Sequence, residues 1–318
     1  MKKIAITLGD PNSISPEIII KSLNKLNLPP EKVIIIGNEL VFDFYEKELN
    51  LKLNNNYDII NIPFETKDLK IRLETKEAGA FSFKAIEKAC ELANNKEIKA
   101  IVTGPVSKFA MNMAGYHYAG QTEIIEKLTK KEGQKAEMLF ICEDIRIFLL
   151  TRHIALKEIP NMLKKDFITE KIINLNNSLK KDFGIEKPKL ALCSLNPHAG
   201  ENGLFGDEEI KEFIPAIDSL KENDIDIYGP FPSDGLFSNL SKDLKENKKP
   251  TYDCYIASYH DQGLIPIKLL AIDNSVNTTI GLDILRTSPA HGTAFDIAGK
   301  NLANENSMTC ALNIAVNS

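Results

Sequence analysis

Several features that would assign the chain to a class of protein are missing from its sequence. The longest apolar runs, such as residues 33–36 and 145–150, are far shorter than the ~20 residues that a membrane helix needs. The 318 residues carry a formal net charge of -5 and no block of basic residues, which argues against a nucleic-acid partner. The first apolar stretch ends at Gly9-Asp10, too soon for a signal peptide. We therefore expect a cytoplasmic protein that binds neither membranes nor nucleic acids.

Cysteine motifs and common nucleotide-binding motifs are missing as well. The five cysteines are widely spread and include no C-x-x-C pair, so neither a disulfide framework nor a cysteine zinc site is indicated. We expect them to be small core residues in a reducing compartment. No G-x-G-x-x-G follows a strand and no G-x-x-x-x-G-K-[ST] occurs, which argues against an ordinary Rossmann site and a P-loop.

Strand-like and helical patterns alternate along most of the chain, which predicts an α/β fold with a mainly parallel sheet. The expected strands are 4–8, 33–36, 58–62, 100–102, 189–193, 224–228, 252–258 and 275–280, and the expected helices include 78–92, 207–222 and 308–316. Residues 137–142 and 145–150 flank Glu143-Asp144 and predict an antiparallel hairpin. The length favours two domains, and no linker or repeat separates them, so the domains should be intimately connected.

Three of the five histidines, His153, His198 and His260, directly follow strand-like runs. In α/β sheets, the loops at the carboxyl ends of strands border the ligand crevice. Three neutral imidazoles can bind a divalent metal and leave positions open for water or substrate. Ligand softness ranks zinc, cobalt and manganese ahead of magnesium, although nearby carboxylates can shift that order. The alternative is three unrelated loop histidines, and His198 in particular can simply hydrogen-bond its own glycine-rich loop, Ser194–Asp207.

Charged residues form a second cluster of candidates. Asp261, beside His260, suits an orienting group or a general base, and it suits equally the N-cap of a short helix. Lys268, which lies between apolar residues, is costly to bury unless it meets an anion. The same argument applies to Arg286. Together with Asn277, these side chains can clamp a carboxylate or phosphate, although surface salt bridges are their commoner use.

Polar residues before two expected helices are weaker candidates. Ser107 follows Gly104-Pro105 and Thr122 follows Gly120-Gln121, at places where free N–H groups and the helix dipole favour anions. Both side chains are equally good helix caps. Asp234, in a segment rich in glycine and proline, is interpreted first as a turn residue and second as a catalytic acid.

Taken together, these motifs resemble the 4-hydroxythreonine-4-phosphate dehydrogenase family of pyridoxal phosphate (vitamin B6) biosynthesis. The resemblance runs nearly end to end. It rests on Thr7-Leu8-Gly9-Asp10-Pro11 with Pro16-Glu17, Thr103-Gly104-Pro105-Val106 with Lys108, Gly120 with Thr122-Glu123, Asn196-Pro197-His198-Ala199-Gly200-Glu201, Tyr259-His260-Asp261-Gln262-Gly263, and Arg286-Thr287 with His291-Gly292-Thr293-Ala294.

This resemblance implies a two-domain fold like that of isocitrate and isopropylmalate dehydrogenases, with an active-site cleft between the domains. The expected first domain comprises residues 1–115 and 281–318 on the NAD side, and the second comprises residues 116–280 with the metal ligands and the dimerisation surface. Such dehydrogenases bind NAD without a Rossmann fingerprint. The stretch from His291-Gly292-Thr293 to Gly299 looks like their adenosine-binding loop, so NAD is the expected cofactor, with NADP as the alternative.

The resemblance also implies roles for individual residues. It makes His153, His198 and His260 the ligands of a zinc, cobalt or magnesium ion, with His260 supplied across a homodimer interface. The implied substrate-binding residues are Gln121, Thr122, Lys268, Asn277 and Arg286. The implied proton acceptor is Asp261 or Asp234, or a metal-bound water that relays to one of them.

The implied reaction is the oxidation of 4-phosphohydroxy-L-threonine by NAD. The β-keto acid product then loses carbon dioxide and gives 3-amino-2-oxopropyl phosphate. Two departures from the family pattern stand out: Gln121 replaces the usual histidine, and Ser13-Ile14-Ser15 replaces Gly-Ile-Gly, which questions close approach to that loop's backbone. The alternatives are a paralogue acting on phosphoerythronate or phosphothreonate, a metal-dependent hydrolase, and a catalytically silent binding protein.

Overall fold

The computed structural model describes residues 2–271 and 273–318, which form two compact units. The first unit contains the chain up to residue 136 together with residues 276–318, and the second contains residues 137–275. Residues 116–136 and 276–280, which we expected in the second domain, belong to the first unit. The reason is local packing: helix α5 (Gln121–Thr129) lies against α3 (Lys76–Asn94), and strand β10 (Val276–Ile280) pairs with β11 (Leu285–Pro289).

The first unit is built on strands in the order β3-β2-β1-β4-β11-β10. Neighbouring strands are parallel except for β10, which runs antiparallel to β11. The central strand β1 has Ile4, Ala5 and Ile6 fully buried, as expected for a parallel strand that is covered on both faces. Besides β10 and β11, the strands of this sheet are β1 (Lys3–Thr7), β2 (Val33–Gly37), β3 (Asp58–Asn61) and β4 (Ile98–Thr103).

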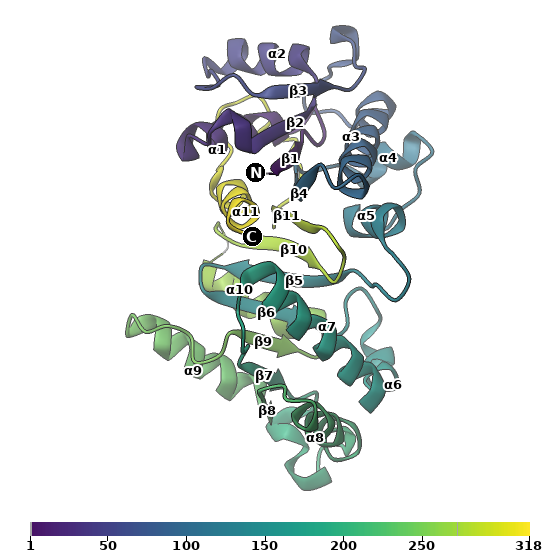
Figure 1. Ribbon diagram of the computed structural model, residues 1–318, viewed down its shortest axis with the longest axis vertical. Helices are drawn as coiled ribbons and strands as arrows, with labels where there is room; N and C mark the ends of the chain where they lie inside the picture. Colours follow the sequence, from purple (N-terminus) through teal and green to yellow (C-terminus); the bar gives the residue numbers. More distant parts are fainter. Residues whose placement is uncertain (1, 272) are drawn as a thin grey trace. The chain divides into compact units, whose positions relative to one another are not determined.

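Helices cover both faces of this first sheet. Figure 1 shows α1 and α11 on one face and α3, α4 and α5 on the other, and α11 contacts β11 and β4 while α3 contacts β1 and β4. The expected C-terminal helix therefore returns to the first unit. The helices are α1 (Ser15–Leu26), α2 (Glu39–Leu49), α4 (Lys108–Met113) and α11 (Asn306–Asn317), with short 3-10 turns η1 (Pro30–Lys32) and η2 (Thr66–Asp68).

The second unit has strands in the order β5-β6-β9-β7-β8. Strands β5 and β6 form the predicted antiparallel hairpin, and β6, β9, β7 and β8 are parallel to one another. Alternate residues Ile145, Ile147 and Leu149 of β6 point into one core with Leu236, Leu264 and other residues of the helices that cover that face. The strands are β5 (Glu137–Cys142), β6 (Ile145–Leu149), β7 (Leu190–Cys193), β8 (Ile227–Phe231) and β9 (Cys254–Ala257).

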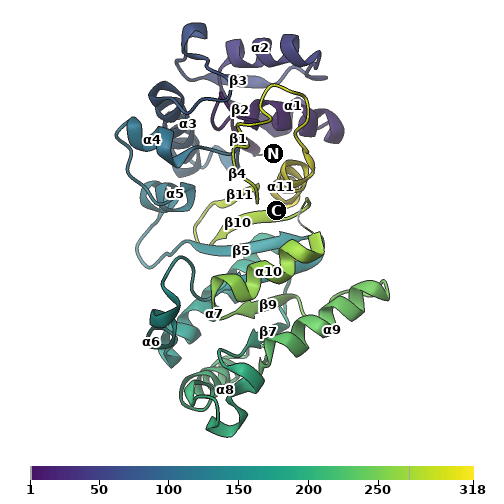
Figure 2. The same ribbon diagram turned by 180° about the vertical axis from the view of Figure 1, so that it is seen from behind.

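Helices α9 and α10 supply that core, and Figure 2 shows α10 lying over the strands on this face. Pro266 interrupts the hydrogen-bond ladder inside α10. No helix within residues 2–271 and 273–318 combines the length and apolar character of a bilayer span. The helical elements are η3 (Leu156–Glu158), α6 (Ile159–Met162), α7 (Lys165–Phe183), the 3-10 segment η4 (Pro197–Gly203), the π-helix η5 (Glu209–Phe213), α8 (Ile214–Glu222), α9 (Ser233–Lys245) and α10 (His260–Ala271).

Most expected elements are confirmed, and the exceptions have physical causes. Strand β8 lies at 227–231 rather than 224–228, because Asp224 adopts a left-handed turn after α8. Strand β11 was missed because its sequence, Leu-Arg-Thr-Ser-Pro, contains no apolar run although all five residues are buried. Four of the five cysteines are buried, as expected, and burial raises the pKa of Cys193 to about 12.

Candidate functional site

In the second unit, the three candidate histidines follow three adjacent parallel strands. His153 comes after β6, His260 begins α10 after β9, and His198 lies in η4 after β7, while the strand order is β6-β9-β7. Parallel neighbours end at the same edge of a sheet, so all three histidine-bearing segments leave from one edge. The next strand, β8, leads to Asp234 in the first turn of α9.

His153 and His260 form a pair within one chain. Their ring centres are 5.6 Å apart, and both line a pocket of about 230 Å³ together with Tyr259 and Asp261. Zinc–nitrogen bonds of about 2.0–2.1 Å would place two imidazoles on one ion with ring centres roughly 5–6 Å apart, so this pair fits a shared metal. The sequence did not predict that His260 would lie beside His153 of its own chain.

Asp261 has the orienting position that the sequence suggested. Its Oδ1 lies 2.7 Å from Nδ1 of His260, so Nδ1 carries the proton when the ring is neutral and Nε2 is left for a metal. The Asp261 side chain is 71% exposed, so solvent weakens this contact as an ion pair. Arg152, which sequence reasoning overlooked, lines the same pocket, and its Nη1 is buried without a hydrogen-bond partner among the described residues.

His198 lies apart from this pair. No group of three or more His, Cys, Asp or Glu side chains that could hold a metal occurs within residues 2–271 and 273–318. His198 is exposed and has a left-handed backbone, with φ of 52°, and its ring centre is 6.2 Å from that of Phe205. The structure therefore brings together two of the three expected ligands.

Gln262 connects the segments that carry these candidates. Its Oε1 accepts the backbone N–H of Ser258 at the end of β9, and its Nε2 donates to the carbonyl of Ser194 and to Oγ of Ser233, at 2.6, 2.8 and 3.2 Å. One amide thus ties the start of α10 to the His198 loop and to the start of α9. The sequence marked Gln262 as part of a family motif without assigning it a role.

An apolar groove runs beside α9 and α10. Asp234 and Asp261 both line it, together with Phe237, Ile265 and Leu269. Ile265 and Leu269 are 58% and 81% exposed, which is unusual for large apolar side chains on one helix. Lys268 is exposed in the same helix, so its positive charge is open to solvent in the single chain.

In the first unit, Arg286 is a buried cation for which the described residues provide no ion-pair partner. It is 3% exposed, and its Nε and Nη2 donate to Oγ1 of Thr103 at 3.0 and 2.6 Å. No ion pair to Arg286 forms within the described part of the chain. Burial lowers the pKa of Arg286 to about 10, and the charge of Glu123 opposes that shift, so the guanidinium stays protonated at neutral pH. Such a group is costly to bury unless an anion joins it.

Three of the other expected substrate residues, Gln121, Thr122 and Asn277, belong to the first unit together with Arg286. Thr279, opposite Arg286 in the β10–β11 ladder, has its Oγ1 3.4 Å from Oγ1 of Thr122, which is 5% exposed. Gln121 precedes Thr122, and its Nε2 donates to the carbonyl of Gly104 at 3.2 Å. Two amide oxygens, Oε1 of Gln121 and Oδ1 of Asn277, are buried and have no hydrogen-bond partner among the residues that the structure describes. Ser107 caps α4, as one sequence interpretation proposed.

Asp10 is a buried carboxyl group to which the sequence gave no role of its own. It is fully buried, its Oδ1 accepts the N–H of Asn12 at 2.9 Å, and its Oδ2 has no partner. Burial raises the pKa of Asp10 to about 7, with the Asn12 hydrogen bond opposing the shift and Glu74 adding to it. Its backbone N–H donates to the carbonyl of Pro105 at 2.8 Å, which places it beside the loop that also contacts Gln121.

The two serines that replace family glycines turn inward. Ser13 Oγ donates to the carbonyl of Asp10 and Ser15 Oγ donates to the carbonyl of Leu8, and both residues are fully buried. Ser15 Oγ fills the space beside Gly9 and Gly104. The outer side of this loop's backbone is therefore not covered by the serine side chains.

The expected cofactor segment, His291–Gly299, is exposed at His291 and Gly292 and anchored elsewhere. The carbonyl of Thr293 accepts the N–H of Ile14 at 3.1 Å, and the carbonyl of Ala298 accepts Nε of Arg72 at 3.0 Å. Exposed residues on a segment that hydrogen bonds hold in place are suited to binding a nucleotide. His291 Nδ1 lies 3.1 Å from the carbonyl of Gly292.

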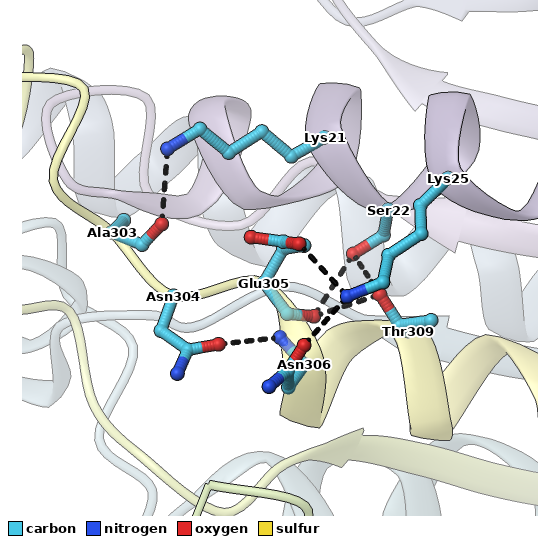
Figure 3. A network of polar contacts seen from close by, with 8 residues as sticks. All are labelled: Lys21, Ser22, Lys25, Ala303, Asn304, Glu305, Asn306 and Thr309. Carbon is cyan, nitrogen blue, oxygen red and sulfur yellow. Dashed lines mark hydrogen bonds and ion pairs between the residues drawn. The ribbon is translucent and has the colours of Figure 1, made fainter.

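A polar network fixes the downstream end of this segment to α1 (Figure 3). Lys21 donates to the carbonyl of Ala303 at 3.0 Å, and Lys25 forms an ion pair with Glu305 at 3.0 Å. Fully buried Glu17 accepts the N–H of Ala303 at 2.8 Å and pairs with Lys21. The segment is thus held to the first unit at both ends.

Residues 11–315 match a family model that is described as pyridoxal phosphate biosynthetic protein PdxA. The chain belongs to this family. A 4-hydroxythreonine-4-phosphate dehydrogenase from a Sulfurihydrogenibium species is 37% identical over 99% of this chain and 98% of its own length. A D-threonate 4-phosphate dehydrogenase from Pectobacterium atrosepticum is 36% identical over 99% of this chain and 98% of its own length. PdxA relatives of almost equal identity therefore bear two different substrate names.

Solved structures agree with the PdxA assignment. A crystal structure of 4-hydroxythreonine-4-phosphate dehydrogenase from Klebsiella pneumoniae has a TM-score of 0.85 and 33% identity, with all of both chains covered. Isocitrate dehydrogenase from Methylococcus capsulatus has a TM-score of 0.50 and 14% identity over 99% of this chain and 85% of its own, which concerns the fold alone. The expected relation of the fold to isocitrate dehydrogenases is confirmed.

Proposed function

We propose that this PdxA protein oxidises 4-phosphohydroxy-L-threonine with NAD and a divalent metal, and that the β-keto acid product then loses carbon dioxide. The observation that carries the proposal is the His153–His260 pair, with Asp261 on Nδ1 of His260. The contact with Asp261 leaves Nε2 of His260 for a metal beside a pocket that His153 also lines, which a purely structural pair of histidines would not require. NADP is the alternative to NAD, and zinc, cobalt or magnesium is the expected metal.

Each bound group would supply one part of the chemistry: the metal would lower the pKa of the substrate hydroxyl, and NAD would accept the hydride. His153, His198 and His260 would hold the ion, and Asp261 would keep His260 in the ligating tautomer. Asp261 is committed to that contact, so Asp234, exposed along the same groove, is our proposed proton acceptor. The nucleotide would lie against His291, Gly292 and Thr293.

The anionic end of the substrate suits the residues around Arg286. A phosphate would give this buried guanidinium the partner that the chain itself does not provide. Thr122 would donate its hydroxyl to the same anion. The unpartnered oxygens of Gln121 and Asn277 are acceptors, so they would bind N–H or O–H groups of the substrate rather than its phosphate. Lys268, which is exposed in the second unit, is a further proposed substrate residue.

We further propose a homodimer in which a second copy covers the apolar groove beside α9 and α10. Support comes from the exposure of Ile265 and Leu269 and from the absence of a third metal-binding group beside His153 and His260 in the described chain. His260 begins the helix that carries these apolar residues. Covering the groove would thus place the partner next to the histidine pair.

NADH absorbance with purified protein, 4-phosphohydroxy-L-threonine, NAD and Zn²⁺, Co²⁺ or Mg²⁺ tests the function. We expect turnover that a chelator abolishes and added metal restores. His153→Ala, His198→Ala and His260→Ala should each lower kcat/KM at least ~100-fold, because each would remove a metal ligand. His117→Ala is the matched control, since His117 is exposed and hydrogen-bonded to Asn112, and its activity should be unchanged. No NADH with any metal would refute the dehydrogenase proposal for this substrate.

A phosphorylated four-carbon sugar acid is the second candidate substrate. The buried Gln121 Oε1 can accept a hydrogen bond from a substrate hydroxyl as well as from an amine. The same assay with phosphoerythronate and phosphothreonate discriminates the two, because a higher kcat/KM for either acid would reassign the enzyme to that substrate. Metal-dependent release of phosphate without NADH would instead identify a hydrolase.

A further inference from the structure

The segment that carries His198 has an unusual backbone. His198, Ala199, Gly200, Glu201 and Asn202 all have positive φ, between 42° and 76°, so five consecutive residues are left-handed. Four of them are not glycine, and each such residue costs about 1–2 kcal/mol relative to a right-handed conformation. A run of this kind persists only where its surroundings hold it in place. The neighbouring contacts should therefore include a group that fixes this turn.

Glu209 hydrogen-bonds to the residues that precede the left-handed turn. It is 1% exposed, and its Oε1 accepts the backbone N–H groups of Leu195 and Asn196, both at 2.8 Å. Its Oε2 accepts Nδ2 of Asn196 at 2.9 Å. These three hydrogen bonds fix the chain two residues before His198. The turn packs directly on the carboxylate, because a Cβ at Gly200 would lie 2.8 Å from Glu209 Oε2.

The three N–H donors around Glu209 match the two acceptor oxygens of a carboxylate. No ion pair to Glu209 forms within the described part of the chain, so its buried charge is compensated by N–H donors alone. A glutamine has one acceptor oxygen, and its amide nitrogen would face the Nδ2 donor of Asn196. Burying a charge in this way is costly and is not needed merely to close a surface loop. Glu209 is also the first residue of the π-helix η5, and π-helical turns are frequent at functional sites.

We propose that Glu209 is a positioning residue that aims His198 at the metal. It does not touch the metal or the substrate; it fixes the backbone from which the His198 ring projects. The inference rests on the proposed function, because it assumes that His198 is a metal ligand. Without the carboxylate, the left-handed turn would relax, and His198 would have to be ordered each time a metal binds.

The test compares Glu209→Gln with Glu212→Gln in the metal-free full-length protein, titrated with Co²⁺. Glu212 lies in the same π-helix, but its carboxylate accepts the N–H of Lys165 and pairs with Lys164, away from the His198 turn. We expect Glu209→Gln to weaken Co²⁺ binding about 10–100-fold and to change the cobalt absorption spectrum. Glu212→Gln should bind as the wild type does. Saturating Co²⁺ should restore much of kcat in Glu209→Gln without changing KM for the substrate.

Asn196→Ala provides a milder variant should Glu209→Gln fold poorly. It removes the side-chain hydrogen bonds to Glu209 and to Oε2 of Glu208 and leaves the two backbone bonds to Glu209, so it should weaken Co²⁺ binding only about 2–5-fold. A lower unfolding temperature with wild-type Co²⁺ affinity and spectrum, in either variant, would overturn the proposal and leave Glu209 a structural role only.

His198→Ala in the same titration separates this inference from the proposed function. If His198→Ala binds Co²⁺ with wild-type affinity and stoichiometry, His198 is not a ligand and the metal assignment itself is wrong. If His198→Ala loses binding while Glu209→Gln retains it fully, the metal assignment stands and the role of Glu209 is refuted.

Discussion

Asp10 lies shortly after β1, and its carboxyl group is fully buried in the first unit. Burial disfavours the charged form, which raises the pKa from 3.8 to about 7. The folded protein therefore binds more protons at this group than the unfolded chain does between about pH 4 and pH 7. Its contribution favours folding at low pH, and that contribution is lost as pH rises through this window. The backbone N–H of Asp10 donates to the carbonyl of Pro105, in the loop whose Gly104 carbonyl accepts Nε2 of Gln121.

Asp10→Asn removes this titration, because an amide is neutral at every pH. We expect the free energy of unfolding of the variant, relative to wild type, to rise between pH 4 and pH 7 and then to level off. The relative free energy of unfolding can rise by at most roughly 4 kcal/mol, because the pKa of Asp10 differs by about three between the folded and unfolded states. Urea unfolding at half-unit pH steps measures it. Asp43→Asn, at an exposed position of α2, is the control, and equal slopes for both variants would contradict the assigned pKa of Asp10.

Single residues of the site differ in how far the sequence could predict them. His153, His198 and His260 were identifiable because each follows a strand, and that rule depends only on local pattern. Arg286 was a candidate because a cationic side chain is costly to bury unless it meets an anion. Asp10, Glu209 and Gln262 gave no such signal, because their roles depend on contacts between segments that are distant in the sequence. The exposure of Lys268 agrees with the commoner use of a lysine at a surface, the alternative that the sequence left open.

Packing between helices α3 and α4 depends on a glycine with no room for a side chain. A Cβ at Gly79 in α3 would lie 2.0 Å from the carbonyl oxygen of Ala110 in α4. Gly235 in α9 offers the opposite case, since a Cβ there meets nothing within 4 Å. Both glycines lie in helices with ordinary backbone angles, so helix propensity alone would favour alanine at each by about 1 kcal/mol.

Gly79→Ala and Gly235→Ala should therefore have opposite effects. At Gly79 the clash with rigid backbone outweighs the propensity gain, and we expect a loss of stability of about 2 kcal/mol or more. At Gly235 the gain is unopposed, and we expect an increase of about 0.5–1 kcal/mol. Chemical denaturation of both variants provides the comparison. An increase in stability for Gly79→Ala would mean that α4 can move away from α3 at little cost.

Secondary-structure elements were predictable where the pattern of apolar residues was strong. The parallel strands of the first unit and the β5–β6 hairpin follow from buried runs and turn residues. Strand β11 could not be found in this way, because its buried polar residues are satisfied by partners such as the Thr103 hydroxyl and the carbonyl of Ala311. The π-helix at Glu209 extends a helical pattern that the sequence already contained, and only the contacts of Glu209 reveal why it begins there.

Assembly is the level at which the single chain leaves most to be tested. One copy alone explains neither the exposed apolar groove beside α9 and α10 nor the separation of His198 from the other two proposed metal ligands in the described chain. The resemblance to the family implies that His260 crosses to a partner, whereas the structure pairs His260 with His153 of the same chain. Two arrangements of the ligands are therefore in competition, and they differ in which inactive variants can complement one another.

Mixing His198→Ala with His260→Ala protein distinguishes these arrangements. If each site takes His198 from one subunit and His260 from the other, a heterodimer keeps one intact site of two. Random reassortment of equal amounts should then restore about a quarter of the wild-type activity. If all ligands come from one chain, every site in the mixture lacks a histidine and activity stays absent. Tagged subunits, purified in tandem, would prove that heterodimers formed, so their inactivity would refute ligand sharing between subunits.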